Sequence, residues 1–392
     1  MSKPKKKKKK NLLIATDNFL PRWDGIASFL NELVPRIEKD YNITLIAPDF
    51  GDHKKKVTYK SKVIKFKLFK LRMGDYYPAI VKKKVLAKEI KKADVIFLQS
   101  LGPIGLWTTL FAKRFKKPAI RYNHSNEWEL FPNSLGKRLL KTPINLLSKF
   151  LGRILYNMYK VVIVSSIEQV ELLNLMGIRC EKKVVHLGVD VNHYKPSKIA
   201  LAKHELGIDP RKFVIGYAGR LGHEKDLKTL YRAFLRMTKK YDDVLLLIAG
   251  GGHPELERLF SNKSNVIFTG PKDDLSLYYQ AMDVYVLPSL TETTSLTTME
   301  AMATATPVVV TPVGFMKEYI NDGVNGMLFP KKNSYALYSK LQHLKENHED
   351  RVKLGRNGRE TIKEHYDWDK TAENIKKIID LVSIQDSGNL AE

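Results

Sequence analysis

Short apolar runs alternate with amphipathic stretches along most of this 392-residue chain. Strand-length runs lie at 11–16, 43–47, 95–99, 119–122, 161–165, 213–218, 244–249, 266–268, 284–287 and 307–310. Apolar residues at helical spacing follow these runs, for example over 26–37. Strands that alternate with helices indicate βαβ units and parallel sheets. We therefore predict an α/β fold with two doubly wound domains.

The length of the chain also favours two domains, each large enough to bury its own core. Turn residues without a sustained period over 188–210 mark the linker. We predict a first domain over 11–195 and a second over 205–365. A lysine-rich tail over 1–10 is expected to be disordered. A cleft is expected between the two domains.

Positive charge is concentrated in the first half. Residues 1–195 contain 40 Lys and Arg against 16 Asp and Glu, a net charge of +24. Residues 196–392 contain 27 against 26, a net charge of +1. The tail lysines supply +7 of the excess, so +17 remains in the body of the first half. Such a basic face is typical of proteins that bind anionic membranes or nucleic acids.

The segment 137–160 combines leucines and aromatic residues at helical spacing with Lys141, Lys149 and Arg153. Two interpretations are open. The commoner one is a helix whose apolar face packs on the core and whose basic face is solvated. The other is a helix that lies on an anionic lipid surface. A second candidate patch, 65–78, also fits an edge strand with outward lysines.

Other features limit the classes of protein to consider. No apolar run approaches the roughly 18 residues that span a bilayer, and no signal-peptide core follows the first lysines. Cys180 is the only cysteine, which excludes an intrachain disulfide and a cysteine-rich metal site. We expect a cytoplasmic location. Walker A and strand-following G-x-G-x-x-G motifs are missing from the sequence, which argues against kinases and dehydrogenases.

Two glutamates flank a turn between a predicted strand and a predicted helix in DVYVLPSLTETTSLTTMEAMATATPVVVT. Glu292 follows the carboxyl end of the strand, and Glu300 lies in the first turns of the helix. Open α/β sheets bind ligands at this end of their strands. Simpler roles are available for both residues. Thr297 and Glu300 fit a capping box, and Glu292 fits a solvated turn position.

A candidate anion site follows a strand of the second half, in GYAGRLGHEKDLKTL. Arg220 lies just after the strand, and Lys225 lies at the start of the next helix. Arginine offers a planar fork to phosphate oxygens and lysine a point charge. Both would stabilise negative charge on a bound phosphate group. The simpler alternative is a solvated arginine paired with Glu224.

These stretches resemble the signature of glycosyltransferase family 4, which are retaining, sugar-nucleotide-dependent enzymes of the GT-B fold. GRL-x-x-EK resembles the family's phosphate-clamping loop, whereas AGGGHPELE and FTGPKDDLSLYYQAMDVYVLPS resemble segments that frame the nucleotide base. TETTS, TDNFLP and SLGPIGL resemble the diacylglycerol glucosyltransferase-like subgroup. The resemblance covers about residues 11–380. It implies two Rossmann-like domains facing a central cleft, and a helix over 366–385 that crosses back to the first domain.

The resemblance also implies roles for single residues. The catalytic residues it implies are His124, Arg220, Lys225 and Glu292. The nucleotide-sugar contacts it implies are Gly25, Arg220, Lys225, Gly250, Gly270, Lys272, Glu292, Ser295, Leu296, Thr297 and Glu300. Arg220 and Lys225 would hold the diphosphate. Glu292 would hold sugar hydroxyls, and Glu300 the ribose, because an ionised carboxylate can accept two O–H groups.

The remaining implied residues act mainly through their backbone. Gly25 would lie beside the donor diphosphate at a helix N-terminus, which suits an anion. Backbone groups around Gly250, Gly270 and Lys272 would surround the base. His124 would contact the donor sugar near the reaction centre. The chain departs from the family pattern at 293–297, where TTSLT replaces G-F-G-x-P, and at Gly25, which follows Asp24 where the family has a second glycine.

The implied function is a retaining hexosyltransferase that moves a hexose from a nucleotide-diphosphate sugar, UDP-glucose, to a lipid such as a diacylglycerol. The donor would bind the second domain and the acceptor the first. No metal cofactor and no nucleic acid are expected. The basic first half would hold the protein peripherally at the inner face of the cell membrane. Two alternatives are open: transfer to a soluble saccharide or polyprenyl-linked glycan, and a basic nucleic-acid-binding protein with an inactive transferase fold.

Overall fold

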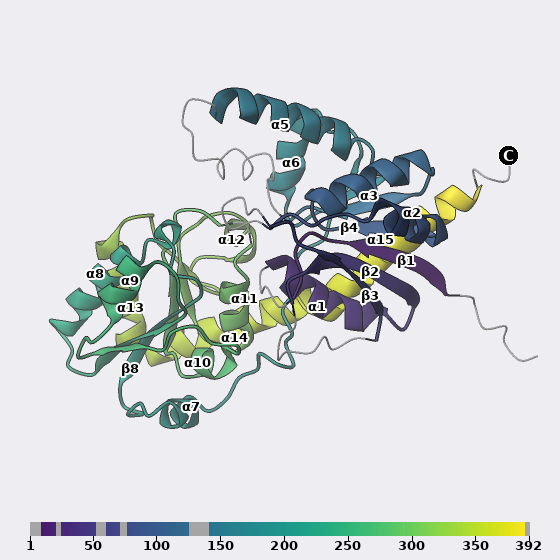
Figure 1. The fold of residues 1–392 in the computed structure, drawn as a ribbon. Coiled ribbons are helices and arrows are strands. Elements are labelled where there is room, and N and C mark those ends of the chain that lie inside the picture. The colour runs from purple at the N-terminus through teal and green to yellow at the C-terminus, as the bar shows by residue number, and fades with distance from the viewer. Residues whose placement is uncertain are drawn as a thin grey trace, which may run out of the picture. The chain divides into compact units, whose positions relative to one another are not determined.

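The computed structural model describes residues 9–20, 25–51, 60–70, 77–124, 141–292 and 294–388, without the side chains of 141–145 and 385–388. The chain divides into two compact units (Figure 1). The first comprises Met1–His186 and Ala372–Glu392, and the second comprises Leu187–Thr371. The first stretch of the first unit therefore ends at His186, before the predicted boundary at residue 195, and the last helix is divided between the two units.

In the described part of the first unit, seven strands form one parallel sheet. In sheet order they are β3 (Lys62–Lys67), β2 (Tyr41–Asp49), β1 (Lys10–Ala15), β4 (Val95–Leu98), β5 (Ala119–Tyr122), β6 (Val161–Val164) and β7 (Glu181–Val184). The order reverses between β1 and β4, which makes their carboxyl ends a topological switch point. β3 is an edge strand, and its three lysines are exposed, as one interpretation of 65–78 predicts. Residues 71–76 lie outside the described part.

The helices of this unit are α1 (Gly25–Ile37), α2 (Lys83–Lys92), α3 (Pro103–Arg114), α5 (Lys141–Tyr156), α6 (Ile167–Leu175) and most of α15 (Trp368–Gly388). α15 packs Ile375, Ile379 and Val382 inward. Lys10 pairs with Asp380 at 3.1 Å, so it belongs to β1 and its surroundings rather than to a tail. Residues 1–8 of the predicted tail lie outside the described residues.

Six strands of the second unit form another parallel sheet within the described ranges. In sheet order they are β10 (Val266–Phe268), β9 (Val244–Ala249), β8 (Phe213–Ala218), β11 (Val284–Leu287), β12 (Val308–Val310) and β13 (Met327–Leu328). The order reverses between β8 and β11. The prediction of two doubly wound parallel sheets is confirmed.

The helices of the second unit are α7 (Ile199–Glu205), η2 (His223–Lys225), α8 (Leu227–Thr238), α9 (Pro254–Phe260), α10 (Ser276–Gln280), α11 (Leu296–Ala303), α12 (Met316–Tyr319), α13 (Ser334–Glu346) and α14 (His348–His365). α7 lies in the range predicted as the linker. Lys203 of α7 is buried and pairs with Asp283 at 2.7 Å, which fastens α7 to the sheet.

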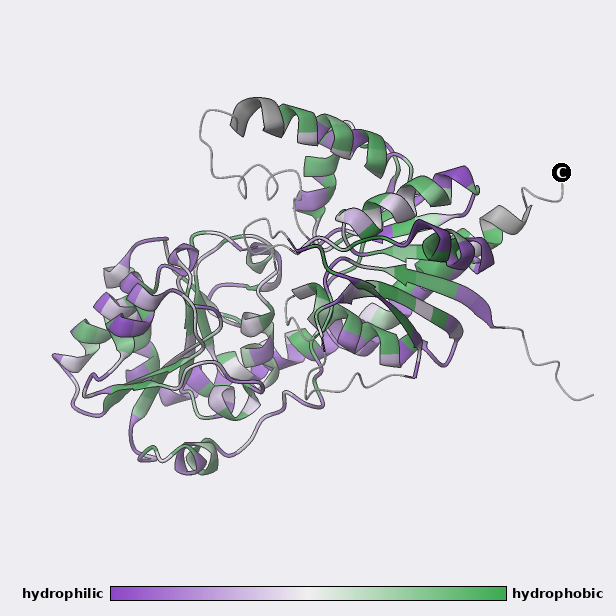
Figure 2. Cartoon of the chain, viewed as in Figure 1, coloured by the Kyte–Doolittle hydropathy of each residue, from purple (hydrophilic) through white to green (hydrophobic). Residues whose placement is uncertain are grey.

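Each unit has its own hydrophobic core. Most strands are built mainly from apolar residues and are largely green in Figure 2, as expected for strands covered on both faces, whereas β3 and β7 carry several charged residues. α8 shows the matching helical pattern, because Leu230, Ala233, Phe234 and Met237 recur on one face and are buried. Among the described residues no helix is both long and apolar enough to cross a membrane.

Candidate active site

Two motifs of the sequence meet at the switch point of the second sheet. Arg220 lies in the segment that leaves β8, and Glu292 lies in the segment that leaves β11. β8 and β11 are hydrogen-bonded neighbours. The backbone N–H of Leu290 donates to the carbonyl of Glu224 at 2.8 Å, which joins the two segments directly. Ligands of open α/β sheets bind at such a place.

Lys225 and Glu292 form an ion pair across these segments. Their side chains are 18% and 10% exposed. Glu292 also accepts a hydrogen bond from the hydroxyl of Ser289, with an O–O distance of 2.6 Å. Glu292 is therefore not the solvated turn carboxylate of the simpler interpretation.

Arg220 remains available to a ligand. Its guanidinium donates to Glu224 at 2.5 Å, and its side chain is 70% exposed. The surface pair of the simpler interpretation is thus present. Exposed pairs of this kind contribute little to stability, so Arg220 can exchange Glu224 for a phosphate oxygen at little cost.

Glu300 lies on α11 and faces the phenol of Tyr279, whose hydroxyl donates to Oε2 at 2.8 Å. Burial raises the pKa of Glu300 to about 7, although the Tyr279 hydroxyl favours the ionised form. The capping-box alternative is wrong, because Ser295 is the N-cap and α11 begins before Thr297. The hydroxyl of Thr297 instead accepts from Tyr285 at 2.9 Å.

The turn before α11 has a left-handed residue that is not glycine. Ser295 has φ 58° and ψ 73°, and its hydroxyl lies 2.8 Å from that of Thr298. A non-glycine residue pays for this conformation, and such strain clusters at functional sites. Leu296 and Thr297 are the first residues of α11, where backbone N–H groups have no acceptor inside the helix. Thr293 lies outside the described residues.

The glycines after β9 and β10 hold adjacent loops close together. Gly250 donates its N–H to the carbonyl of Gly270 at 3.0 Å. A Cβ on Gly250 would lie 1.8 Å from the carbonyl oxygen of Gly219, and its φ of 150° is disfavoured for other residues. Gly270 has φ 68° but open space around it. Lys272 is exposed, with Nζ 5.9 Å from the ring centre of Tyr278.

His124 lies in the first unit, just after β5. Its Nε2 is 2.8 Å from Oε1 of Gln99, and its ring packs against those of Phe29 and Tyr122. Burial, reinforced by the positive charge of Arg121, lowers the pKa of His124 to about 3. The imidazole is therefore neutral at physiological pH. With Gln99 Oε1 as acceptor, Nε2 carries the proton and Nδ1 is an acceptor.

Gly25 is the first residue of α1, as the resemblance implies for a helix N-terminus. A Cβ there would meet nothing within 4 Å, so packing does not require a glycine. α1 also carries Phe29, which contacts His124. The helix that begins at Gly25 therefore packs on the predicted histidine.

Sequence reasoning gave no role to Asp17, which is buried in the first unit. Its carboxylate accepts from the backbone N–H groups of Ile104 at 2.8 Å and Gly105 at 3.0 Å, and from the hydroxyl of Ser100 at 3.0 Å. It thus caps α3. The two segments TDNFLP and SLGPIGL, which carry the subgroup resemblance, are joined by this carboxylate. The occurrence of both segments in one sequence was the signal that could have pointed to Asp17.

Two family models match consecutive parts of the chain. The model described as Glycosyltransferase Family 4 matches residues 23–193. The model described as Glycosyl transferases group 1 matches residues 199–361. Together they span both units.

Curated relatives agree with these matches. The alpha-monoglucosyldiacylglycerol synthase of Streptococcus pneumoniae is 27% identical over 342 residues, which cover 82% of this chain and 75% of the relative. The enzyme of the same name from Acholeplasma laidlawii is 27% identical and covers 71% and 73%. A D-inositol 3-phosphate glycosyltransferase of Mycobacterium sp. is 32% identical over 182 residues, which cover 43% and 40%.

Solved structures show the same fold. Anabaena HepE in complex with UDP matches with a TM-score of 0.76 and 19% identity, over 94% of this chain and 99% of HepE. HepE in complex with UDP-glucose matches with a TM-score of 0.75 and 18% identity, over 95% and 99%. The predicted GT-B architecture is confirmed.

Proposed function

Because the chain belongs to the glycosyltransferases of the GT-B fold, as its two family matches show, we propose that it is a retaining hexosyltransferase that glucosylates a membrane lipid. The donor in this proposal is UDP-glucose, and the acceptor is a diacylglycerol-type lipid at the cytosolic membrane face. Relatives named alpha-monoglucosyldiacylglycerol synthase support the acceptor. HepE structures with UDP and UDP-glucose support the donor.

In the proposed donor site, positive charge meets the diphosphate. Arg220 exchanges Glu224 for phosphate oxygens, and Lys225 adds a second cation at the same switch point. The N–H groups of Leu296 and Thr297 offer further donors at the start of α11. We propose that these groups supply the electrostatic stabilisation without a metal ion.

Two carboxylates hold hydroxyls in this proposal. Glu292, already fixed by Lys225 and Ser289, accepts hydroxyls of the sugar. Glu300 accepts the ribose hydroxyls beside Tyr279. Nδ1 of His124 accepts a further sugar hydroxyl, since the imidazole is neutral. The loops that contain Gly250, Gly270 and Lys272 frame the base.

The proposed reaction is a front-face displacement. The bond between the anomeric carbon and the phosphate oxygen breaks, and a bond to the acceptor hydroxyl oxygen forms on the same face. The acceptor proton passes to the leaving phosphate, and UDP departs. Glu292 acts as a binding group in this proposal, because Lys225 and Ser289 fix its Oε1.

The observation that carries the lipid acceptor is the exposed apolar face of α5. Leu147, Phe150, Leu151 and Ile154 recur at helical spacing and are 57%, 60%, 47% and 41% exposed. Figure 2 shows this helix as largely green. Of the two interpretations of this segment, packing of the apolar stripe on the core does not fit. Soluble proteins rarely expose such a stripe, and apolar helix faces of this kind insert into the lipid headgroup region.

The charge around α5 selects an anionic bilayer as its partner. Lys149 and Arg153 are exposed on the same helix. The first half of the chain has a net charge of +24. Each basic residue near an anionic leaflet contributes about 1 kcal/mol. A lipid acceptor in the bilayer would then lie within reach of the acceptor unit.

Vesicle co-sedimentation tests the docking surface. Wild-type protein should bind phosphatidylglycerol-containing vesicles and be released by salt. Leu147→Glu should weaken binding by about 3 kcal/mol, roughly a hundredfold, because it loses a buried leucine and adds a repelled charge. Leu201→Glu is the matched control, since Leu201 is 56% exposed but lies on α7 of the second unit. Equal effects of the two substitutions would refute α5 as the docking surface.

The acceptor is tested separately, with radiolabelled UDP-glucose and diacylglycerol in the same vesicles. The expected product is a monoglucosylated lipid, identified by mass. Transfer to a soluble acceptor such as an inositol phosphate, without any lipid product, would overturn the lipid proposal. The match to D-inositol 3-phosphate glycosyltransferase makes that acceptor worth including.

A further inference from the structure

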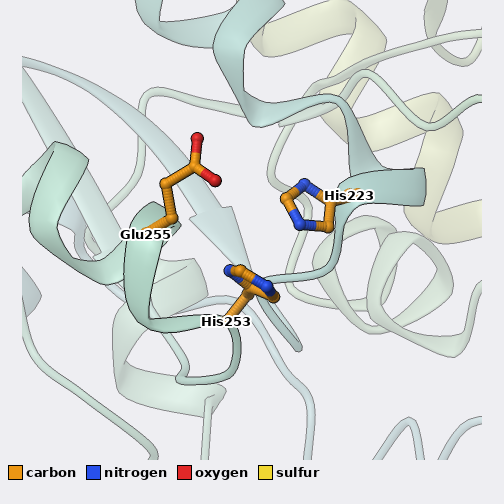
Figure 3. Close-up of side chains that lie close together, drawn as sticks. All are labelled: His223, His253 and Glu255. Carbon is orange, nitrogen blue, oxygen red and sulfur yellow. The ribbon is translucent and has the colours of Figure 1, made fainter.

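Two histidines and a glutamate converge at the edge of the switch point in the second unit (Figure 3). His223 begins η2, His253 precedes α9, and Glu255 lies in the first turn of α9. Each offers a ligand atom, and these atoms all lie within 4.8 Å of one another. The two imidazole rings have centres 4.2 Å apart. All three side chains are exposed.

The backbone beneath this group is held in register. The N–H of Leu221 donates to the carbonyl of Gly251 at 3.0 Å, and the N–H of His253 donates to the carbonyl of Leu221 at 2.8 Å. A Cβ on Gly252 would lie 2.5 Å from the carbonyl oxygen of Leu221, so the two loops are in close contact. His223 and His253 therefore project from backbones whose separation is fixed.

We propose that His223, His253 and Glu255 form a binding site for a divalent transition metal ion, best matched by Zn²⁺. Two imidazoles and one carboxylate are a usual zinc ligand set that leaves the fourth tetrahedral position open. Imidazole nitrogens favour Zn²⁺, Cu²⁺ or Ni²⁺ over Mg²⁺ or Ca²⁺, which prefer all-oxygen sites. None of the three residues is among those assigned to donor binding, although His223 shares η2 with Lys225.

The distances are compatible with closure on a metal. Tetrahedral bonds of about 2.1 Å place ligand atoms about 3.4 Å apart. Separations of up to 4.8 Å therefore close by little more than 1 Å. Exposed side chains achieve this by rotation. Lys228 holds Oε1 of Glu255 at 2.7 Å, which orients the carboxylate and leaves Oε2 for the metal.

The site has a consequence for its surroundings. A bound ion would cross-link η2 to the start of α9. η2 ends at Lys225, and the loop that enters α9 begins at Gly250. Metal binding would therefore restrain two segments that the donor site uses.

Isothermal titration of Zn²⁺ into chelator-treated, untagged full-length protein at pH 7.5 tests this inference. One equivalent should bind. His223→Ala and His253→Ala should each weaken binding by at least about tenfold, and Glu255→Gln should weaken it similarly. Affinity should fall at pH 5.5, because metal ligation requires neutral imidazoles.

The matched control is His204→Ala, which removes an exposed histidine from α7 of the same unit and should leave binding unchanged. Circular dichroism establishes that each variant is folded, and three independent ligand variants keep the test open if one is not. Zn²⁺ binding that is absent in the wild type, or equal in the wild type and the His223 and His253 variants, would overturn the inference. The measurement uses neither donor nor acceptor, so it is independent of the proposed activity.

Discussion

Glu300→Gln separates two effects of one partly buried carboxylate, on folding and on donor binding. Burial raises the pKa of Glu300 from 4.5 to about 7. Each pKa unit corresponds to 1.36 kcal/mol, so the ionised carboxylate costs the folded state about 3 kcal/mol. The variant keeps an acceptor for the hydroxyl of Tyr279 but carries no charge.

The pH dependence of this cost has a defined sign. Below pH 4.5 the carboxyl is protonated in both folded and unfolded chains, and the cost is absent. Between pH 4.5 and about 7 the unfolded chain loses the proton while the folded chain retains it, so wild-type stability falls. Above pH 7 the full cost applies. The stability of Glu300→Gln relative to wild type should therefore rise by about 3 kcal/mol from pH 4 to pH 8.

Urea denaturation at the two pH values measures this difference, and titration calorimetry with UDP measures donor binding. Wild-type affinity for UDP should fall below pH 7, because only the ionised carboxylate accepts two ribose hydroxyls. Glu300→Gln should bind UDP more weakly at pH 8 and lose the pH dependence. Glu205→Gln, at an exposed position of α7, controls for a general effect of the substitution. A variant whose stability and UDP affinity follow wild type at both pH values would refute the reasoning.

Three further predictions test packing in the two units. Gly250→Ala should lower the free energy of unfolding by about 3 kcal/mol, because its Cβ meets a backbone carbonyl oxygen. Gly270→Ala, which has open space around its Cβ, should lower it by only about 1 kcal/mol. Equal losses of stability in urea denaturation would contradict this geometry. Lys225→Met should destabilise the fold by about 2 kcal/mol, because it leaves Glu292 without its cation. Adding Glu292→Gln should restore most of that stability but should not restore sugar-transfer activity. Additive losses of stability in the double-mutant cycle would contradict the pairing. Asp17→Ala should cost about 2 kcal/mol by uncapping α3, and an unchanged thermal midpoint would show that the cap contributes nothing.

The central strands were predictable because they are covered on both faces and so are almost continuously apolar. The hydrophobic pattern did not predict elements in which a polar residue is buried or in which charged residues form a strand. α7 was hidden because Lys203 is buried through its pair with Asp283, and the sequence alone shows only a polar residue. β7 was missed because Glu181, Lys182 and Lys183 dominate its composition.

The sequence predicted which residues belong to the candidate site but not which of them contact one another. Arg220, Lys225 and Glu292 were each chosen from a local motif, but the contact between Lys225 and Glu292 follows from the strand order. Burial in the folded chain raises the pKa of Glu300, and the hydroxyl of Tyr279, which lies in another helix, partly opposes that shift. Such partners are set by tertiary packing, which a single sequence does not encode as a local pattern.

Because α15 is divided between the two units, the order of synthesis affects the order in which the units can complete their folding. The second unit is one continuous stretch, Leu187–Thr371, and all of it emerges from the ribosome before Ala372. The first unit needs Ile375 and Ile379 for its core, so its nascent chain waits while the whole second unit is synthesised. At about 5–20 residues per second the delay is roughly 10–40 s. The second unit is thus free to finish folding first, and the core of the first unit is completed only after Ile375 and Ile379 have emerged.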